Sequence, residues 1–545
     1  MNSELIPQTP KALVADWKSL ERAFLRPENE EAKNTLIKYM EQILFGLHDF
    51  LRAHVGITEE KSLRDLAEQF SETHLAKTPE KKLAEVITDL VKDIAPHAVN
   101  VASPFFIGHM TAAIPFFMVH LKSITAALNQ NVVKLETSKV LSILEKQVLA
   151  KIHRLVYGLD ESFYAEHVQN TETALGCFTE DGTIANLTAL WVARNCLLAP
   201  KPGFGGIEKE GLAAAYGAYN IDRCVILVSR MGHYSLRKAG GILGIGNKNV
   251  IAIDVDEHHH IDMKQLRDTV KTLCKDGKTK ILSIVGIAGA TETGTIDPLE
   301  ELSQLCAEQG IHFHVDAAWG GPTLMSDRYR HLLNGIARAD SITIDGHKQF
   351  YMPMSCGMVY FKDPYALDAI AYYARYINRP GSVDLGIKSL SGSREANSLI
   401  LDSALKIMGT HGYALLIEYG IRTAREFAEE ISRRADFELT SAPELNILTY
   451  RFFPAKLKAS IAGLDMAGKK ILYDKLNEIN RSIQRHQREA GKSFVSRTSL
   501  KGTEQWPEER VVLRAVIMNP LTDMPILREI LDEQEDIYRR IQAEI

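Results

Sequence analysis

Hydrophobic residues recur at two different spacings along the chain. Residues 30–51 and 81–94 carry Leu, Ile, Val or Met three or four positions apart, which predicts two helices. From about Cys224 the pattern changes to short unbroken apolar runs, and helical patterns separate several of them. These runs are CVILVS (224–229), NVIAIDV (249–255), KILSIVGIA (280–288), IHFHVDAA (311–318), SITID (341–345) and CGMVYF (356–361). Such runs are typical of strands buried on both faces of a mainly parallel sheet, so we expect an α/β domain.

The remaining patterns divide the chain into three parts. Asp297 and Pro298 are expected to start a helix, as N-cap and first helical residue, and Gly310 to end it. A Gly- and Ser-rich stretch over 378–394 precedes a predicted helix over 398–408 and strand patterns at 445–453 and 510–518. We therefore expect an N-terminal helical segment (1–100), a large cofactor-binding domain (101–376) and a small α+β domain (377–545).

Composition narrows the class of protein. The 545 residues are 45% hydrophobic with a net charge of -5, which gives no support for nucleic acid or an anionic membrane as partner. His120 and Lys122 interrupt the most apolar stretch, so we expect no membrane span. The start lacks signal-peptide features, and six cysteines without a CxxC pair suggest free thiols; we expect a cytoplasmic protein. The run 258–260, three histidines, is expected in an exposed turn, and no metal is predicted.

Polar side chains follow two of the predicted strands. Asp316 ends one strand before small residues, and His347 and Lys348 follow the strand over 341–345. Ligands of open α/β sheets bind at the carboxyl ends of strands, so we expect Asp316 and Lys348 to face one crevice. A lysine amine can form a Schiff base with an aldehyde, and an aspartate can keep a pyridinium nitrogen protonated. These are the groups that pyridoxal 5'-phosphate (PLP) requires, although each residue alone is more often a cap or a surface charge.

The segments HVDAAWGG (314–321) and DGHKQF (345–350) resemble the group II PLP-dependent amino-acid decarboxylases. The resemblance extends from about residue 105 to the helix after Arg394, and the arrangement is most similar to the bacterial PLP-dependent aspartate 1-decarboxylases. It implies the type I, aspartate aminotransferase-like fold of PLP-dependent enzymes, with a mainly parallel sheet and a smaller C-terminal domain. It also implies a homodimer whose cofactor pocket lies near the subunit interface.

The resemblance also implies roles for individual residues around the cofactor ring. Lys348 would form the Schiff base and Asp316 would pair with the pyridinium nitrogen. Ala318 would pack on one face of the ring, and His233 would stack on the other, close enough to the reacting carboxylate for positioning or proton transfer. Thr291 would lie near a ring substituent or Asp316.

A phosphate needs backbone N–H groups at a helix N-terminus. Gly182 and Thr183 precede an apolar helical run and are predicted to provide them. Asp181 stands immediately before, and because an acid beside a dianion is unfavourable, we expect it to point away. His347 is a further candidate for contact with the phosphate.

The resemblance further suggests how the substrate is bound. Arg394 would hold the α-carboxylate, while His109, Thr111 and Asn131 would face the distal group, and Lys134 is a further cation that is more often simply solvated. These residues favour an acidic substrate: L-aspartate, giving β-alanine for pantothenate and coenzyme A supply. Glutamate (giving 4-aminobutyrate), cysteine sulfinate, and an aminotransferase or lyase reaction remain open.

The expected proton donor is missing from its usual place in this family. The stretch 378–393 contains no tyrosine, whereas most members carry one on the corresponding mobile loop. Tyr372, Tyr373 and Tyr376 lie just before it. Either another residue, for example His233 or one of these tyrosines, protonates Cα, or the reaction differs from decarboxylation.

Overall fold

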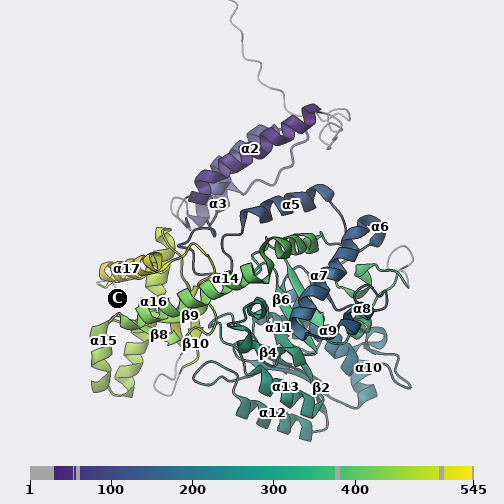
Figure 1. Cartoon of the computed structure of the whole chain (residues 1–545). Coiled ribbons are helices and arrows are strands. Elements are labelled where there is room, and N and C mark those ends of the chain that lie inside the picture. The colour runs from purple at the N-terminus through teal and green to yellow at the C-terminus, as the bar shows by residue number, and fades with distance from the viewer. Residues whose placement is uncertain (1–29, 53–54, 57–61, 375–380, 503–508, 543–545) are drawn as a thin grey trace, which may run out of the picture.

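A seven-stranded sheet forms the centre of the large domain in this computed structural model, which describes residues 30–52, 55–56, 62–374, 381–502 and 509–542 (Figure 1). Its strands are β1 (Gly176–Thr179), β2 (Arg223–Ser229), β3 (Val250–Ile253), β4 (Thr279–Ile287), β5 (His312–Asp316), β6 (Ser341–Asp345) and β7 (Gly357–Phe361). They lie in the order β1-β7-β6-β5-β4-β2-β3. The five strands from β6 to β3 are parallel, and β7 runs antiparallel to both of its neighbours. The six predicted strands are confirmed; the sequence analysis missed β1.

Helices cover both faces of this sheet. Along β2, Val225 and Leu227 belong to one hydrophobic cluster and Ile226 and Val228 to another, as expected for a strand whose side chains alternate between two buried faces. The first cluster includes α7 (Val140–Tyr157), α12 (Met263–Lys275) and α13 (Leu299–Gln309). The second includes α9 (Gly182–Leu197), α10 (Ile207–Tyr219) and α11 (Tyr234–Ile242). The predicted α/β architecture is therefore confirmed.

The ends of α13 show which local signals determine a helix boundary. Gly310 adopts φ +61° and ends the helix as predicted. The expected N-cap role of Asp297 is wrong: Pro298 occupies the N-cap position, and the buried Asp297 carboxylate instead accepts hydrogen bonds from the N–H groups of Ile261 (2.8 Å) and Ile287 (2.9 Å). Long-range backbone donors therefore take the carboxylate that the sequence pattern assigned to the helix.

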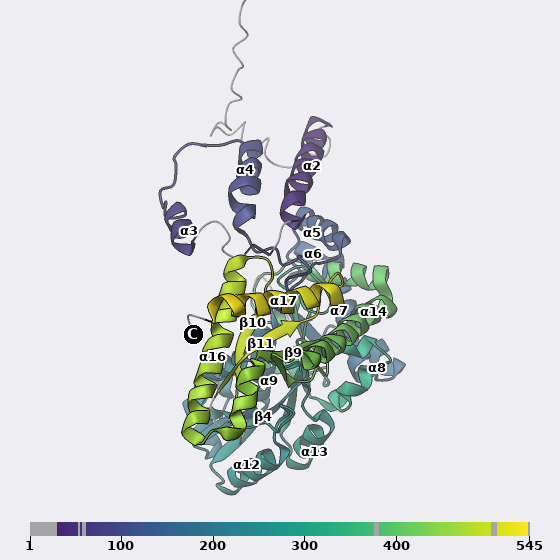
Figure 2. The ribbon, with the colours of Figure 1, turned by 90° about the vertical axis from the view of Figure 1, so that its left-hand side faces the viewer.

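The small domain contains an antiparallel sheet in the order β10-β11-β9-β8. Its strands are β8 (Phe437–Ser441), β9 (Ile447–Phe452), β10 (Ser496–Leu500) and β11 (Arg510–Val516). The long helix α14 (Asn397–Arg433), α16 (Met466–Ala490) and α17 (Met524–Ile541) share its hydrophobic core. The helix predicted over 398–408 is the start of α14, which continues beyond a non-helical residue, Gly409. Figure 2 shows α16 and α17 packed beside this sheet.

The segment before α5 (Phe116–Leu128) joins the small sheet. The Ile107 N–H donates to the Phe494 carbonyl at 3.0 Å, and the Val516 N–H donates to the Ile107 carbonyl at 2.7 Å. The predicted domain boundary at residue 101 therefore assigns to the large domain a segment that packs on the small one. The consequence is that residues near 109 and near 514 lie side by side.

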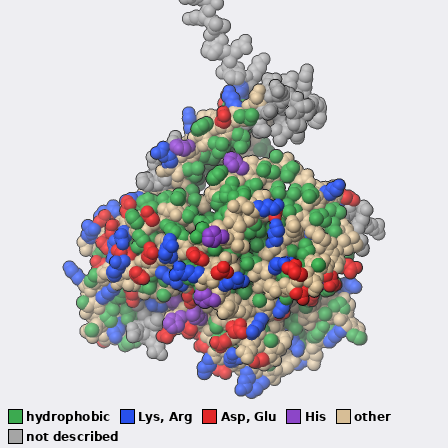
Figure 3. All heavy atoms as spheres, in the orientation of Figure 1, with side chains coloured by type: hydrophobic (Ala, Val, Ile, Leu, Met, Phe, Trp, Pro, Cys, Tyr) green, Lys and Arg blue, Asp and Glu red, His purple; other side chains and the backbone are tan. Residues whose placement is uncertain are grey.

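The N-terminal helices stand off from the rest of the chain (Figure 2). They are α2 (Glu30–Arg52), α3 (Leu63–Gln69) and α4 (Leu83–Asp89), and a π-helical turn follows over Leu90–Ile94. The helices predicted over 30–51 and 81–94 are thus confirmed. Short helices α6 (Leu135–Ser138), α8 (Glu161–His167) and α15 (Ala455–Ser460) complete the fold. Figure 3 shows apolar side chains gathered over the upper part of the molecule, where α2 and α5 lie.

Four sequence expectations concern the cysteines, a membrane span, the histidine run and metal binding. Of the six free cysteines, Cys196 and Cys274 are exposed and the others are buried. Among the described helices, none is both long enough and apolar enough to cross a membrane. The expected exposure of the whole histidine run is wrong: His258 is exposed and His260 is partly buried, but His259 is buried, with its Nε2 3.2 Å from the Thr440 carbonyl oxygen. Within the described residues no cluster of His, Cys, Asp and Glu could hold a metal ion.

Candidate active site

The carboxyl ends of the strands of the large sheet surround a cavity of about 290 Å³. Each of five strands, β1, β2, β4, β5 and β6, is followed by a segment that contributes to its wall, as is usual for open α/β sheets. Ten of the predicted site residues line it: His109, Thr111, Gly182, Thr183, His233, Thr291, Asp316, Ala318, His347 and Lys348. Another cavity, of about 390 Å³, lies between α7 and residues 381–388, and none of the predicted site residues line it. The first cavity is therefore the candidate site.

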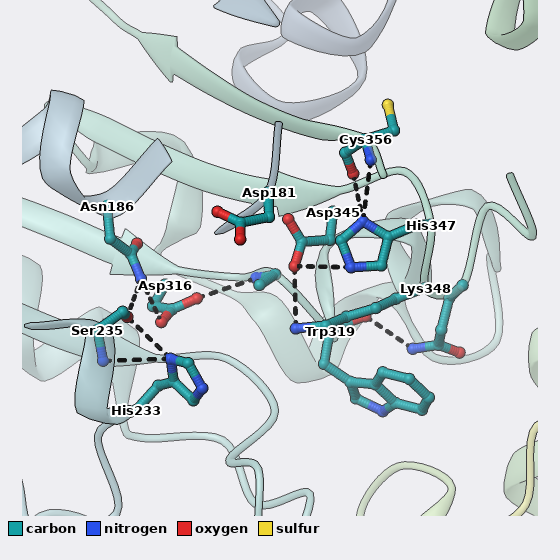
Figure 4. Close-up of polar contacts among 12 residues, drawn as sticks. Asp181, Asn186, His233, Ser235, Asp316, Trp319, Asp345, His347, Lys348 and Cys356 are labelled. Carbon is teal, nitrogen blue, oxygen red and sulfur yellow. Dashed lines mark hydrogen bonds and ion pairs between the residues drawn. The ribbon is translucent and has the colours of Figure 1, made fainter. Parts of the chain in front are cut away.

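The amine of Lys348 lies at the centre of this site (Figure 4). Its Nζ lies 3.0 Å from Oδ2 of Asp345, the last residue of β6. The ion pair of Lys348 is therefore with Asp345 and not with Asp316. Asp345 is 2% exposed, and burial raises the pKa of its carboxyl although the nearby Lys348 ammonium opposes the shift. His347 also faces it, with Nε2 at 3.8 Å from Oδ2, while its Nδ1 contacts the backbone of Cys356. Asp345 is a site residue that the sequence analysis missed, although it stands in the same segment, DGHK.

A buried hydrogen-bond network fixes the carboxylate of Asp316. Asn186, one turn into α9, donates from Nδ2 to Asp316 Oδ2 at 2.9 Å, and the Ala318 N–H approaches Oδ1 at 3.2 Å. Burial lowers the pKa of His314 to about 4, so its ring is neutral and Nε2–H donates to Asn186 Oδ1 at 3.0 Å. The hydrogen bond from His314 orients the side-chain amide of Asn186, and this amide in turn orients the carboxylate of Asp316. A polar residue inside the apolar helical run after Gly182 was the signal for Asn186.

His233 caps α11 and enters the cavity from the end of β2. Its Nδ1 accepts the Ser235 N–H at 3.3 Å and lies 2.9 Å from the Ser235 hydroxyl, which in turn accepts from Asn186 at 3.1 Å. Burial lowers the pKa of His233, against the opposing charge of Asp316. The ring is therefore neutral near pH 7, with Nδ1 as the acceptor and the proton on Nε2.

The first turn of α9 forms the anion-binding part of the cavity. Gly182 and Thr183 are its first residues, and their N–H groups have no carbonyl to bond within the helix. A Cβ built on Gly182 would lie 2.8 Å from Asp345 Oδ2, so this approach is open only to glycine. Asp181 does not leave the cavity wall as expected; it stays there as the N-cap, with Oδ1 accepting the Ile184 N–H at 2.9 Å. Two carboxyl groups thus flank the first turn (Figure 4).

Arg514 is a second site residue that the sequence analysis missed. It projects from β11 of the small domain, is 6% exposed and lines the cavity. Its Nε donates to the Thr291 carbonyl at 2.6 Å and its Nη1 to the Gly108 carbonyl at 3.1 Å, whereas Nη2 has no partner among the described residues. Burial lowers its pKa to about 10, against the nearby charge of Glu292. An arginine inside the apolar run VVLRAVIM (511–518) was the available signal.

Asn131 and Arg394 do not line this cavity. The Arg394 guanidinium forms a two-point salt bridge with the buried Glu145, with Nη2–Oε1 at 2.6 Å and Nη1–Oε2 at 3.1 Å. The Asn131 amide oxygen accepts the Arg394 N–H at 3.2 Å, and its Nδ2 donates to Ser393 Oγ. The Arg394 fork is therefore occupied within this chain, and the structure does not offer it to a substrate. Lys134 pairs with Glu136 at 2.8 Å.

The candidate tyrosines lie elsewhere or outside the described residues. Tyr372 donates its hydroxyl to Glu208, and Tyr373 lines the second cavity. Tyr376 falls within 375–380, outside the described residues. Of the proton donors considered from the sequence, His233 is the one that the structure places in the cavity with Lys348.

The residues of the cavity fit PLP. An amine that can bind its aldehyde, a carboxylate held ready for its ring nitrogen and a helix N-terminus for its phosphate converge in one space. Lys348, Asp316, and Gly182 with Thr183 would hold these three parts. Ala318 and His233 line the same space and would face the ring.

Known proteins resemble the chain over most of its length. The family model described as pyridoxal-dependent decarboxylase conserved domain matches residues 66–453. An aspartate 1-decarboxylase of Aliivibrio fischeri is 45% identical over 527 residues, which cover 97% of this chain and 95% of the relative. The acidic amino acid decarboxylase GADL1 of Homo sapiens is 27% identical and covers 82% of this chain and 80% of its own length. The crystal structure of mouse CSAD in apo form superposes with a TM-score of 0.78 at 22% identity, covering 92% of this chain and 99% of that one.

Proposed function

The chain belongs to the pyridoxal-dependent decarboxylases, and on that premise we propose that it removes the α-carboxylate of L-aspartate to give β-alanine and carbon dioxide. Family membership establishes the type I fold of PLP-dependent enzymes, PLP as the cofactor and amino-acid decarboxylation as the class of reaction. The choice of aspartate is our proposal. It is supported by the 45% identical relative and by the cations in the cavity.

The observation that carries the proposal is the buried Arg514 in the same cavity as Lys348. A buried guanidinium with an unpartnered Nη2 among the described residues is unfavourable until an anion reaches it. A carboxylate of the substrate fits this need, because Nη2 can donate charge-assisted hydrogen bonds to it while Nε and Nη1 stay bonded to the Thr291 and Gly108 carbonyls. His109 lies nearby, and burial together with the charges of Arg514 and Lys348 lowers its pKa, so it would act as a neutral hydrogen-bond partner for a second carboxylate.

The remaining residues divide the chemistry among them. Bound PLP supplies the sink for the electron pair that stays on Cα when the bond to the carboxylate breaks. Asp316, held by Asn186, would keep the ring nitrogen protonated, and Lys348 would hold the cofactor through its aldehyde until the substrate amine takes its place. Arg514 fixes one carboxylate and so limits the orientations that the bonds of Cα can adopt. His233, after taking up a second proton from solvent, would give its Nε2 proton to Cα in place of the lost carboxylate and return to the neutral ring.

A substrate panel tests the proposal. The holoenzyme is incubated with aspartate, glutamate or cysteine sulfinate labelled with ¹⁴C in the α-carboxylate, and labelled carbon dioxide and the amine product are measured. We expect the highest kcat/KM with aspartate. Faster release from glutamate would move the assignment to a glutamate decarboxylase that forms 4-aminobutyrate. Keto-acid formation with the label retained would indicate an aminotransferase.

Two arginine variants separate the candidates for carboxylate binding. Arg514→Lys keeps a charge but loses Nη2 and the bonds that hold the guanidinium to the Thr291 and Gly108 carbonyls, so we expect KM for aspartate to rise roughly 10- to 100-fold, or about 1.4–2.7 kcal/mol. Arg394→Lys is the matched control, because it disturbs a buried pair with Glu145 outside the cavity. It should lower stability and leave KM unchanged. The opposite outcome would return the role to Arg394.

We also propose a homodimer in which a second copy covers the apolar face over α2 and α5. Phe45 and Phe116 are 77% and 78% exposed, and Leu44, Leu51 and Ile124 are about half exposed on the same two helices (Figure 3). An apolar face of this kind is typical of a protein interface. Phe116→Asp should convert the dimer to monomer in sedimentation velocity. Met466→Asp, at an equally exposed apolar residue that begins α16, should not.

A further inference from the structure

Asp345 lies between the two places where the cofactor is attached. Its Oδ2 is 3.0 Å from Lys348 Nζ, and a Cβ on Gly182 would lie 2.8 Å from the same oxygen. Figure 4 shows the carboxylate beside Asp181 and next to the Lys348 amine. The carboxylate therefore stands at the end of β6 against the first turn of α9, where the phosphate would bind.

The electrostatic surroundings of Asp345 contain little spare positive charge. Lys348 pairs with it, and His347 Nε2 lies 3.8 Å away. Asp316 on β5 and Asp181 at the start of α9 add negative charge to the cavity, and His233 from α11 is neutral near pH 7. Cys356, which follows β6, is a buried thiol whose pKa is raised by burial and by Asp345. Asp345 Oδ1 is buried and has no hydrogen-bond partner among the described residues.

A phosphate dianion on the Gly182 and Thr183 N–H groups would stand against this carboxylate. The helix N-terminus attracts it, but it offers only about half a positive charge. Two anions that share a site with little water do not both stay ionised, and the more protonatable group takes up a proton. Asp345 is that group, because it is buried, its pKa is already raised, and its Oδ1 is free to carry a hydrogen and donate it.

We propose that Asp345 takes up one proton when the phosphate of the cofactor binds at the first turn of α9, so that loading of the cofactor is coupled to pH. The protonated carboxyl of Asp345 then donates a hydrogen bond at the first turn of α9. The ionised carboxylate, by contrast, repels the phosphate. Asp345 acts here as a positioning residue for the cofactor. The inference concerns cofactor binding and holds whichever amino acid is the substrate.

The coupling is measured on the apoenzyme with pyridoxine 5'-phosphate, which carries the phosphate but has no aldehyde to react with Lys348. Between about pH 7 and 9 the phosphate of the probe is already a dianion, so the phosphate does not titrate, and any titration of the ring affects the wild type and its variants alike. We expect the dissociation constant of the wild type to rise by up to about tenfold per pH unit. In Asp345→Asn, which has the same shape but cannot ionise, the dissociation constant should rise less steeply with pH than in the wild type and be lower at the upper end of the range.

Asp181→Asn is the matched control, since it removes a carboxylate at the same turn and keeps an N-cap of equal quality. It should tighten binding at every pH and keep the slope of the wild type. Calorimetry of the wild type in buffers of different ionisation enthalpy provides a second readout that needs no variant. Uptake of close to one proton per bound probe is expected at the upper pH. No uptake in the wild type, or an unchanged slope in Asp345→Asn, would overturn the proposal.

Discussion

Asn186 connects three groups on which the site depends, and its removal is the sharpest test of the buried network. The side chain is 1% exposed. It donates to Asp316 at 2.9 Å and to Ser235 at 3.1 Å, and it accepts from His314 at 3.0 Å. We predict that Asn186→Ala lowers both the free energy of unfolding and the affinity for the cofactor.

The expected loss of unfolding free energy depends on which hydrogen bonds the three partners of Asn186 retain in the variant. A buried polar group that loses its partner costs about 1–3 kcal/mol. Here Asp316 keeps the Ala318 N–H, Ser235 keeps His233, and His314 keeps the Ser341 hydroxyl, so each loss falls toward the lower end. Water in the vacated space restores part of it. We expect a loss of about 2–4 kcal/mol in unfolding free energy. Because Asp316 loses the donor that orients it, the dissociation constant for PLP should rise at least roughly tenfold, or about 1.4 kcal/mol.

Urea unfolding of the apoenzyme and titration of PLP by its visible absorbance measure the two effects separately. Asn195→Ala is the control, because Asn195 lies on the same helix and is also buried, with 6% of its surface exposed. Its side chain donates to Glu208 at 2.8 Å and to the Ala369 carbonyl at 2.7 Å, and both bonds lie away from the cavity. It should lose similar stability and bind PLP normally. Normal PLP affinity in Asn186→Ala, or equal weakening in both variants, would refute the reasoning.

Two further predictions use the titration of partly buried groups. Burial raises the pKa of Glu292, and once this carboxyl is ionised it competes with the substrate carboxylate for Arg514. Glu292→Gln should therefore lower KM several-fold above neutral pH and leave kcat unchanged. Steady-state kinetics across the pH range measure both values, and a rise in KM would contradict the prediction. The hydrogen bond to Glu444 raises the pKa of His260 in the folded protein. The pair therefore stabilises the folded protein fully below the ordinary histidine pKa of about 6.5, and this stabilisation is lost as the pH rises through the pKa that His260 has in the folded state. Glu444→Gln should destabilise the protein more in mildly acidic than in alkaline urea titrations, and equal losses would contradict the pairing.

The sequence predicted the sheet because its strands are buried on both faces. Unbroken apolar runs such as SITID correspond to β6 residue for residue. The glycine signal at Gly310 was also reliable, because a left-handed residue ends a helix whatever lies around it. Asp297 failed as a cap because Ile261, 36 residues away, donates to its carboxylate. Local sequence patterns therefore predicted the strands and the end of the helix, which depend on local geometry. They failed at Asp297, where backbone groups distant in sequence compete for the carboxylate.

The same limit applies to the candidate site. Residues that follow the predicted strands directly, such as Lys348 and Asp316, were found because topology brings the strand ends together. Arg394 follows a Gly- and Ser-rich stretch and Arg514 lies inside an apolar run, but neither context shows that Glu145, 249 residues from Arg394, neutralises Arg394. A single sequence contains no information on such pairing. Asn186 was missed for a similar reason, since its partners come from β5 and α11.

The cavity has two walls of different origin. Lys348, Asp316 and the first turn of α9 come from the large sheet, whereas Arg514 and His109 come from the small sheet and the segment beside it. Changes confined to β11 and residues 107–111 would thus retune which amino acid is accepted while the anchoring of the coenzyme stays intact. With Arg514 and His109 binding the substrate as proposed, selectivity can diversify independently of the chemistry, which makes that strand the natural target for engineering a new substrate.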